Sequence, residues 1–385
     1  MRETGPSVYQ LFDGSGVVTV SAMSRTVSRG DLFAVPSWKS FSARSEADTS
    51  DPDSGALDLF RFSDAPSSRH STSTAPRSTS EEQTMKLATI RTAEGTRAVR
   101  LDGDQHVDLG YTSLGELLAE EDWGSRAVSA GSTTYPVEAA DFAPVVPQPS
   151  KLVCVGLNYR SHIEEMGRDL PEYPVLFAKF ADTLTGANDA VTKPAETEQL
   201  DWECELTIVI GKTVRRADEE QAAAAIAGFT AANDYSVRDW QFRTREWLQG
   251  KMWEATTPVG PYLVTPDELP GGVRPELAAR LTVDGVEKQS ANTSDLLFDP
   301  VDLVRYISTI TTLRPGDLIL TGTNGGVGHA RAPQEFLWGG ESVEITIEGI
   351  GTLTNTVAVA PPARELPPVR RRDSVARAAA REAPR

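Results

Sequence analysis

The sequence predicts a mainly β protein with some α helix, in which a small β domain precedes a larger β-rich domain. Three observations carry this prediction. Short apolar or alternating segments bounded by turn residues outnumber the segments with helical periodicity. Neither an internal repeat nor a Gly-rich nucleotide-binding loop after a strand is found. A composition change just before Met85 separates a Ser-, Thr- and Pro-rich stretch from the alternating segments that follow it.

The chain has 385 residues, which at about 150 residues per domain is enough for two or three folding units. A Ser-, Thr- and Pro-rich stretch with few large apolar residues cannot bury enough surface to fold, so it predicts a linker. The C-terminal stretch, with seven Arg against three acidic residues, predicts a solvated basic tail. The expected units are a segment at 1–66, a disordered linker at 67–84, the small β domain at 85–149, the larger β-rich domain at 150–360, and a disordered basic tail at 361–385.

The individual elements follow from local patterns in chain order. Residues 85–110 alternate apolar and polar side chains between turn residues, as short antiparallel strands do. The Ala-rich stretch 219–233 predicts a helix that ends near Gly228, which would place Asp234 just past a helix. The other expected elements are buried strands at 152–157 and 206–211, an amphipathic helix at 300–310, a turn and strand at 314–323, and a hairpin at 340–357.

The charge balance excludes some classes of protein. Lys and Arg total 38 and Asp and Glu total 55, so the net charge is −17. This argues against a nucleic-acid binder, because affinity for a phosphate backbone needs a basic surface. No window approaches the roughly 20 uncharged apolar residues of a membrane span, and the N-terminus lacks a signal-peptide pattern. We therefore expect a cytoplasmic protein with no membrane or nucleic-acid partner.

Cysteines and histidines limit the metal chemistry. Cys154 and Cys204 both lie in apolar runs typical of buried strands, so we expect free core thiols rather than a disulfide. The chain has four histidines, which argues against a site built from several imidazoles. Any bound metal must therefore be held mainly by carboxylates.

The segment DWECEL, residues 201–206, carries the most specific local pattern. Glu203 and Glu205 are two apart where a strand is expected, so their carboxylates point to the same side. Like charges at this separation raise one another's pKa unless a cation neutralises them. Asp234 offers a third carboxylate, and three carboxylates suit a hard divalent ion such as Mg²⁺, Mn²⁺ or Ca²⁺. The alternative is a solvated polar face of a strand.

A second pattern is GLNYRSHIEEMG, residues 156–167, in which His162 and Glu165 are three apart. On a helix they lie on one face within reach of each other. A carboxylate that accepts the proton of one imidazole nitrogen raises the basicity of the other, which creates a base able to activate water. The alternative is an ordinary surface contact.

Two lysines and a Gly-rich loop complete the candidates. Lys179 and Lys251 lie among apolar or aromatic residues, as a cation held against an anionic ligand does, or as a lysine that reaches past apolar residues to solvent. The loop TGTNGGVGH, residues 321–329, follows a predicted strand and could cradle a carboxylate or an oxyanion. It could equally be a tight turn.

Together these motifs resemble the fumarylacetoacetate hydrolase family over residues 151–357. The family fold is a mixed β-roll that a small β domain often precedes, and residues 85–145 fit that place. One departure is Asn324, where the family motif usually has Pro; we expect a changed turn there. The motifs, in order, are GLNYRSHIEE, PVLFAKF, DWECELTIVIGK, AGFTAANDYSVRDWQ, QGKMWEATTPVGP and LRPGDLILTGTNGGVG.

The resemblance implies roles for individual residues and a homodimeric assembly. The implied ligands of a divalent metal, Mg²⁺ or Mn²⁺ with Ca²⁺ as a third option, are Glu203, Glu205 and Asp234. The implied catalytic residues are the water-activating pair His162 and Glu165, with Lys251. The implied substrate-binding residues are Lys179, Arg238, Gln241 and Thr323.

The resemblance also implies a substrate class, because family members act on 2-oxo acids. Some hydrolyse the carbon–carbon bond of acylpyruvates, and the His162–Glu165 pair favours hydrolysis. Residues 1–66 resemble the C-terminal end of gentisate 1,2-dioxygenases, a cupin fragment that cannot close its barrel alone and that we expect to be poorly ordered or weakly docked. Gentisate cleavage yields maleylpyruvate or its isomer fumarylpyruvate, so hydrolysis of one of these to pyruvate and a four-carbon dicarboxylate is our leading hypothesis.

Two alternatives remain open. One is a decarboxylase or isomerase of a 2-oxo-heptenedioate-type dienoate in homoprotocatechuate degradation, which needs the metal but no attacking water. The other is a binding module that carries a metal on a scaffold without turnover.

Overall fold

The computed structural model describes residues 85–361, except 130, 166, 168 and the side chain of Glu165, and the backbone of six strands nearer the N-terminus. The chain forms two compact units, residues 1–79 and 80–385. The predicted linker, the predicted tail beyond Pro361 and the side chains of residues 1–66 lie outside the described residues, so the interpretation of 1–66 as a cupin remnant stays a prediction.

The N-terminal unit contains two antiparallel sheets of three strands. Their orders are β4-β1-β6 and β3-β2-β5. The strands are β1 (Ser7–Asp13), β2 (Ser15–Val20), β3 (Met23–Ser28), β4 (Leu32–Val35), β5 (Phe41–Ser45) and β6 (Asp58–Phe62).

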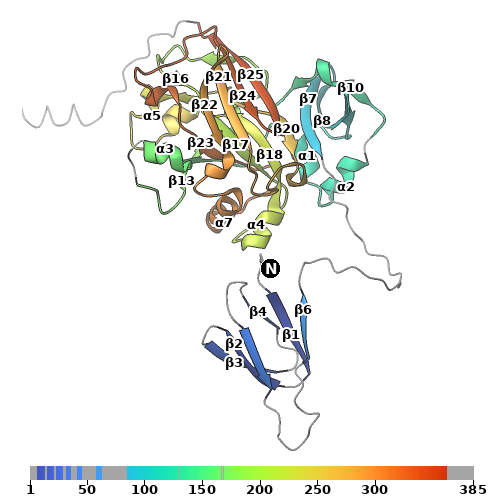
Figure 1. Ribbon diagram of the computed structural model, residues 1–385. Helices are drawn as coiled ribbons and strands as arrows, with labels where there is room; N and C mark the ends of the chain where they lie inside the picture. The colour runs from blue at the N-terminus through green and yellow to red at the C-terminus, as the bar shows by residue number, and fades with distance from the viewer. Residues whose placement is uncertain are drawn as a thin grey trace, which may run out of the picture. The chain divides into compact units, whose positions relative to one another are not determined.

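The second unit begins with the antiparallel strands predicted for residues 85–110. These strands continue the large sheet of the same unit, because Leu87 and Lys86 pair with Leu263 and Val264. The predicted boundary at residue 149 stays a prediction, and the sheet is continuous across it (Figure 1). The elements are β7 (Lys86–Thr92), β8 (Gly95–Asp102), β9 (Gln105–Asp108), α1 (Leu114–Leu118), α2 (Trp123–Val128), β10 (Thr134–Pro136), η1 (Val137–Ala139) and β11 (Asp141–Phe142).

The large sheet runs in the order β10-β9-β8-β7-β20-β18-β17-β23-β12-β13. It is mixed, because β12 and β23 are parallel whereas the other neighbouring pairs on this path are antiparallel. The remaining strands are β12 (Leu152–Gly156), β13 (Val175–Lys179), β17 (Cys204–Ile210), β18 (Ile226–Asn233), β20 (Thr257–Val264) and β23 (Leu318–Thr323), with the short β14 (Leu184–Thr185) beside β20.

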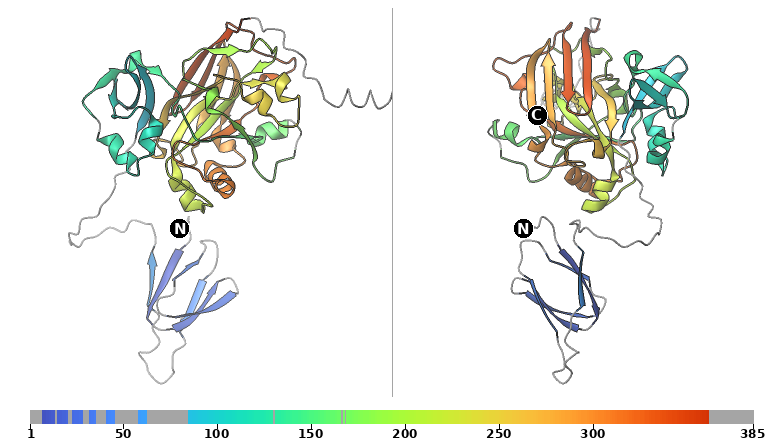
Figure 2. Two further views of the ribbon diagram at one scale, coloured as in Figure 1. Left: turned by 180° about the vertical axis from the view of Figure 1, so that it is seen from behind. Right: turned by 45° about the vertical axis from the view of Figure 1, so that its right-hand side comes forward.

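A second sheet of five strands, in the order β15-β25-β24-β21-β22, lies against the central strands of the first (Figure 2). Leu281, Ile345 and Leu353 from this sheet share one buried apolar cluster with Ile208 and Phe229. A mainly β fold with mixed sheets is therefore confirmed. The strands are β15 (Val191–Lys193), β21 (Ala278–Val283), β22 (Val286–Asn292), β24 (Ser342–Ile347) and β25 (Gly351–Val359); β16 (Leu200–Asp201) and β19 (Ser236–Val237) form a separate pair.

Among the described residues, the helices other than the one at 300–310 are short. The helix predicted for 300–310 is confirmed, with Pro300 in its first turn and Asp299 Oδ1 accepting from the N–H of Asp302 at 2.9 Å. Within the described residues, no helix is long and apolar enough to span a membrane. The helices are α3 (Arg160–Glu165), η2 (Ala181–Thr183), α4 (Glu219–Ala225), α5 (Arg238–Gln241), α6 (Leu248–Lys251), η3 (Pro266–Glu268), η4 (Thr293–Asp295), α7 (Pro300–Ile310) and η5 (Gly328–Ala330).

The helix predicted to begin at 219 and end near Gly228 is wrong in its last turn, and the position of Asp234 just past a helix is wrong with it. Helix α4 ends at Ala225, and residues 226–233 form the central strand β18, so Asp234 follows a strand rather than a helix. Every residue of β18 is buried between its neighbours β17 and β20, and this tertiary pairing outweighs the helical propensity of the alanines. A Cβ at Gly228 would lie 2.2 Å from the carbonyl oxygen of Val264, so the close strand packing requires glycine there.

Candidate active site

Three buried carboxylates meet where β17 begins and β18 ends. The antiparallel pairing places Cys204 opposite Asn233, which brings Glu203 and Glu205 beside Asp234. The main-chain N–H of Asp234 donates to the carbonyl of Glu203 at 3.0 Å and fixes this junction. The candidate ligand oxygens of Glu203, Glu205 and Asp234 all lie within 4.8 Å of one another. The predicted grouping of these three carboxylates is therefore present.

Three buried cations surround the carboxylates. Lys251 Nζ lies 2.7 Å from an oxygen of Glu203 and 2.7 Å from Oδ2 of Asp234. Lys179 Nζ lies 2.6 Å from Oδ1 of Asp234, and Arg238 Nη1 lies 2.7 Å from Oε1 of Glu203. Both lysines are therefore paired inside the protein rather than extended to solvent.

The pKa values of two of these carboxyl groups shift in opposite directions. Burial raises the pKa of Glu205 well above its ordinary value, and repulsion from Asp234 and Glu203 adds to the rise. Burial also acts to raise the pKa of Asp234, but Lys179 and Lys251 together lower it below its ordinary value. Burial would lower the pKa of Lys251, yet Asp234 and Glu203 raise it. Asp234 is thus held as a carboxylate, whereas Glu205 favours its protonated form when no further cation is near.

Glu205 is held by the backbone of the neighbouring strand. Gly322 has φ +101° and directs its N–H to Oε2 of Glu205 at 2.7 Å. A Cβ at this position would lie 2.9 Å from the carbonyl oxygen of Val155, and the positive φ also disfavours other residues. The glycine in the predicted loop therefore serves the carboxylate cluster directly.

Arg238 is almost fully bonded to protein groups. Nε donates to Asp201 Oδ2 at 2.8 Å, and Nη1 also donates to Oε1 of Gln241 at 3.0 Å. Nη2 is buried and has no hydrogen-bond partner among the residues that the structure describes. A buried guanidinium N–H without an acceptor is costly, so it indicates the place of a ligand oxygen.

The loop after β23 is organised by a residue that the sequence did not indicate. The side-chain amide of Gln289, on β22, donates to Oγ1 of Thr323 at 2.8 Å and to the carbonyl of Asn324 at 2.8 Å. Its Oε1 accepts the N–H of Cys204 at 2.9 Å. Because Oγ1 of Thr323 accepts this bond, its hydroxyl proton can point to another acceptor.

Helix α3 carries the other predicted pair. The helical spacing of His162 and Glu165 is confirmed, and His162 is buried, whereas the side chain of Glu165 lies outside the described groups. Oδ2 of Asp295 accepts the Ser161 N–H at 3.1 Å and its hydroxyl at 2.5 Å, which anchors the first turn of α3. The joint action of His162 and Glu165 stays a prediction.

The cluster fits a hard divalent cation. Its donors are carboxylate oxygens, the class that Mg²⁺, Mn²⁺ and Ca²⁺ prefer. With Asp201 included, four carboxyl groups face three cationic side chains among the described residues. Ionisation of Glu205 would therefore leave one negative charge for a further cation to neutralise.

Sequence reasoning missed Asp201 and Asn158 as well as Gln289. Asp201 shares the alternation of Glu203 and Glu205, which was a usable signal. Asn158 donates to the carbonyl of Thr321 at 2.8 Å, and so ties the segment before α3 to β23 across 163 residues of sequence. Neither Asn158 nor Gln289 carried a local signal.

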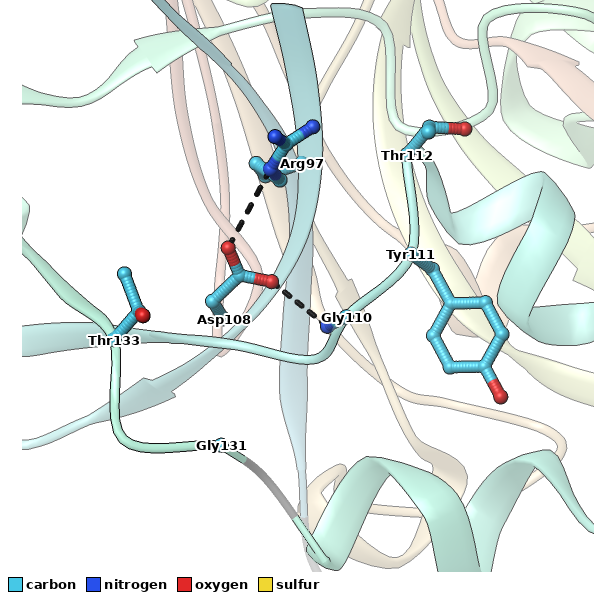
Figure 3. Close-up of a pocket in the computed structure, with 7 residues that line it drawn as sticks. All are labelled: Arg97, Asp108, Gly110, Tyr111, Thr112, Gly131 and Thr133. Atoms are coloured by element: carbon cyan, nitrogen blue, oxygen red, sulfur yellow. Dashed lines mark hydrogen bonds and ion pairs between the residues drawn. The ribbon is translucent and has the colours of Figure 1, made fainter. Parts of the chain in front are cut away.

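A hollow of about 440 Å³, separate from the carboxylate cluster, is lined by residues between 97 and 133 (Figure 3). Its charged lining residues are Arg97 and Asp108, whose Nε and Oδ2 are 3.6 Å apart. Asp108 Oδ1 also accepts the N–H of Gly110 at 2.7 Å. With one carboxylate that is already bonded, this hollow offers no comparable metal site.

Comparison with known proteins agrees with the geometry. Residues 151–358 match the family model described as fumarylacetoacetate (FAA) hydrolase C-terminal. The chain belongs to the fumarylacetoacetate hydrolase family.

Two mammalian relatives are named as tautomerases. The rat protein named oxaloacetate tautomerase Fahd2a, mitochondrial, is 39% identical over 233 residues, which are 60% of this chain and 74% of the rat protein. The human protein named oxaloacetate tautomerase FAHD2A, mitochondrial, is 40% identical over 234 residues, again 60% of this chain and 74% of the relative.

Two solved structures are similar along their whole length. Fumarylacetoacetate hydrolase from Exiguobacterium antarcticum is 31% identical with a TM-score of 0.64, covering 72% of this chain and 100% of that one. A 5-carboxymethyl-2-hydroxymuconate delta-isomerase from Mycobacterium smegmatis is 32% identical with a TM-score of 0.59 and the same coverage. Hydrolase and isomerase names therefore both occur on this fold.

Proposed function

We propose that this protein is a metal-dependent enzyme that binds a 2-oxo acid and stabilises its enolate. The observation that carries the proposal is the buried cluster of Glu203, Glu205 and Asp234, enclosed by three cationic side chains. The cluster would hold the divalent cation, which when bound supplies positive charge to the adjacent oxygens of a 2-oxo carboxylate.

The chain's own residues supply the remaining interactions. Arg238 Nη2, which is buried without an acceptor in the described part of the chain, would donate to a substrate oxygen. The Thr323 hydroxyl would donate a second hydrogen bond, because Gln289 occupies its acceptor side. Lys251 would hold Glu203 and Asp234 in place and add positive charge near the developing enolate.

The first candidate reaction is hydrolysis of an acylpyruvate, fumarylpyruvate or maleylpyruvate. His162, oriented by Glu165, would take a proton from water while the water oxygen bonds to the distal carbonyl carbon. The carbon–carbon bond to the pyruvate unit then breaks, and the pyruvate enolate takes up a proton. The products are pyruvate and fumarate or maleate. Gentisate degradation is proposed as the setting because of the resemblance of residues 1–66.

A coupled assay for pyruvate tests this candidate. The full chain would be incubated with enzymatically generated maleylpyruvate and fumarylpyruvate, with Mg²⁺ or Mn²⁺ and with chelator. We expect pyruvate release that chelator abolishes and that His162→Ala lowers. If neither substrate yields pyruvate, the hydrolase proposal is wrong. Pyruvate release that chelator does not abolish would contradict the metal's role.

The second candidate is isomerisation without an attacking water. It is favoured by the oxaloacetate tautomerase relatives and the delta-isomerase neighbour, and it needs only an enolate and a proton carrier. A dienoate decarboxylase or isomerase likewise needs the metal but no attacking water. The ultraviolet absorbance of enol-oxaloacetate, followed with and without protein, tests it. Faster loss of the enol without pyruvate from acylpyruvates would assign the protein to this class.

We also propose a cytoplasmic location, as the sequence predicts, and a homodimer, as the family resemblance implies. The two mammalian relatives are named mitochondrial, and that location is theirs. Sedimentation of the purified chain would test the assembly, with a monomer mass contradicting it.

A further inference from the structure

Asp201 forms an ion pair with Arg238 and is wholly buried. Its carboxylate accepts four N–H groups, and Oδ2 receives Nε of Arg238 at 2.8 Å. The other donors are main-chain N–H groups of Trp202 at 2.8 Å, Gly328 at 2.7 Å and His329 at 2.9 Å. One carboxylate thus joins α5, which carries Arg238, to the loop that follows β23.

These contacts determine which nitrogen of the guanidinium is left without a partner among the described residues. Because Nε is committed to Asp201 and Nη1 to Glu203 and Gln241, Nη2 is the nitrogen left to meet a ligand. A guanidinium is planar, so the bond at Nε fixes the direction of the whole fork. Without Asp201 the fork can rotate about its last side-chain bonds and lose this direction.

The loop side of the junction is equally constrained. A Cβ at Gly328 would lie 1.9 Å from the carbonyl oxygen of Glu335 and 2.8 Å from Oδ1 of Asp201. The loop therefore approaches the carboxylate at a distance that only glycine permits.

We propose that Asp201 is the positioning residue of this site, and that it acts by aiming Nη2 of Arg238 at the substrate carboxylate. The inference rests on the proposed function, because it takes Arg238 as a substrate-binding group. Asp201 itself touches no substrate atom. Its effect on ligand binding should therefore disappear when Arg238 is absent.

The test measures binding of oxalate, which presents two adjacent carboxylate groups, to the full chain in the presence of Mn²⁺ by calorimetry. The variants are Asp201→Asn, Arg238→Gln and the double variant. Each oxygen of Asp201 accepts two N–H groups. In Asp201→Asn an NH₂ group replaces one of these oxygens and cannot accept, so two hydrogen bonds are lost. We expect Asp201→Asn to weaken oxalate binding about tenfold or more, and to change it less than about twofold in the Arg238→Gln background.

A matched control separates positioning from stability. Asp317 is also a wholly buried carboxylate, bonded to the N–H groups of Lys151 and Arg314 before β12 and β23. Asp317→Asn should lower the unfolding temperature as Asp201→Asn does, but leave oxalate affinity unchanged within about twofold. If Asp201→Asn does not fold, His329→Pro removes one donor to Asp201 and keeps the carboxylate, and should weaken oxalate binding about threefold.

Wild-type oxalate affinity in Asp201→Asn, or a full additional loss in the Arg238→Gln background, would overturn the inference. Absence of oxalate binding to the wild-type chain would overturn it as well. Oxalate binding with the expected pattern, but no turnover of any 2-oxo acid, would support the positioning role and overturn only the proposed function.

Discussion

Strand β23 has buried carboxylates at both of its ends, and the two ends are built differently. At its beginning, Asp317 accepts the hydroxyl of Ser150 at 2.6 Å and the N–H groups of Lys151 and Arg314 at 2.9 and 2.8 Å. Lys151 Nζ completes the set at 2.7 Å. At its other end, Gly322 and Thr323 adjoin the cluster of Glu205, Glu203 and Asp234.

The two ends differ in how far cationic side chains balance their carboxyl groups. At Asp317 one carboxylate meets one ammonium group, and both of its oxygens are bonded to protein donors. At the cluster four carboxylates share three cations, and Nη2 of Arg238 lacks an acceptor within the described residues. A carboxylate whose charge is balanced stabilises the fold, whereas a carboxyl group that ionises only beside a further cation, next to an open donor, costs stability and indicates ligand binding.

Removing a cation from the cluster should have the largest effect. Lys251→Met leaves Glu203 and Asp234 buried without their shared ammonium, and we expect a loss of about 3–5 kcal/mol in metal-free unfolding free energy. Mn²⁺ should restore part of this loss, because it binds the folded form. Urea unfolding with and without Mn²⁺ measures both quantities.

The matched control is Lys151→Met at the Asp317 end. Lys151 is partly exposed, so we expect a loss of about 1 kcal/mol or less and no response to Mn²⁺. Equal losses for the two lysine variants would contradict the distinction between the two ends.

Neutralising Glu205 should separate function from folding. Gln resembles the protonated acid that burial favours and still accepts the Gly322 N–H, so the stability of Glu205→Gln should change by about 1 kcal/mol or less. Mn²⁺ affinity and turnover should both fall about 100-fold or more. The control is Glu341→Gln, at an acid that accepts the main-chain N–H groups of Trp338 and Gly339. This variant should retain both Mn²⁺ affinity and turnover. Wild-type Mn²⁺ affinity in Glu205→Gln would remove it from the ligand set.

Neutralising Asp317 should have the opposite outcome. In Asp317→Asn the new side-chain NH₂ group faces hydrogen-bond donors and cannot accept from them. We expect this substitution to lower the unfolding free energy by about 1–3 kcal/mol. Turnover per folded molecule should be unchanged, since Asp317 lies at the far end of β23 from the cluster. A loss of turnover above about threefold at a temperature where the variant is folded would show that the two ends are coupled.

Gln289 offers a finer test of the cluster end. Gln289→Met removes the donor to Oγ1 of Thr323 and should lower kcat/KM about tenfold, because the hydroxyl is no longer held toward the ligand. Gln221→Met, which removes a helix-capping amide on α4, should affect stability alone. Similar kinetics for the two glutamine variants would argue against a role for the Thr323 hydroxyl.

The smallest effect is expected at His106, away from both ends. Burial lowers the pKa of His106, and its Nε2 lies 3.0 Å from the Tyr262 hydroxyl. The unfolded chain therefore binds a proton more readily, so stability should fall as pH drops below the ordinary histidine value of about 6.5 and level off above it. Urea unfolding across this range should show a shallower slope for His106→Gln. An unchanged slope would mean that other groups cause the pH dependence.

The sequence predicted much of the site because alternation on a strand is a local property. Glu203 and Glu205 were placed on one face by their spacing, and the same spacing also holds Asp201, which we overlooked. The helical spacing of His162 and Glu165 was likewise local. The strand β18 was missed because its alanines favour a helix until β17 and β20 pair with it.

By itself, then, the sequence determined the family, the mainly β architecture and the carboxylates that could hold a metal, because these depend on residue types at short spacing. Only the tertiary structure decided how Asp234 reaches the other two carboxylates, and that Lys179 and Lys251 pair with them. It alone brought Gln289 to Thr323, 34 residues away, and Asp201 to Arg238, 37 residues away. The reason is physical: charge balance and hydrogen-bond direction depend on distances of a few ångströms between strands, and strand pairing sets those distances only once the sheets have formed.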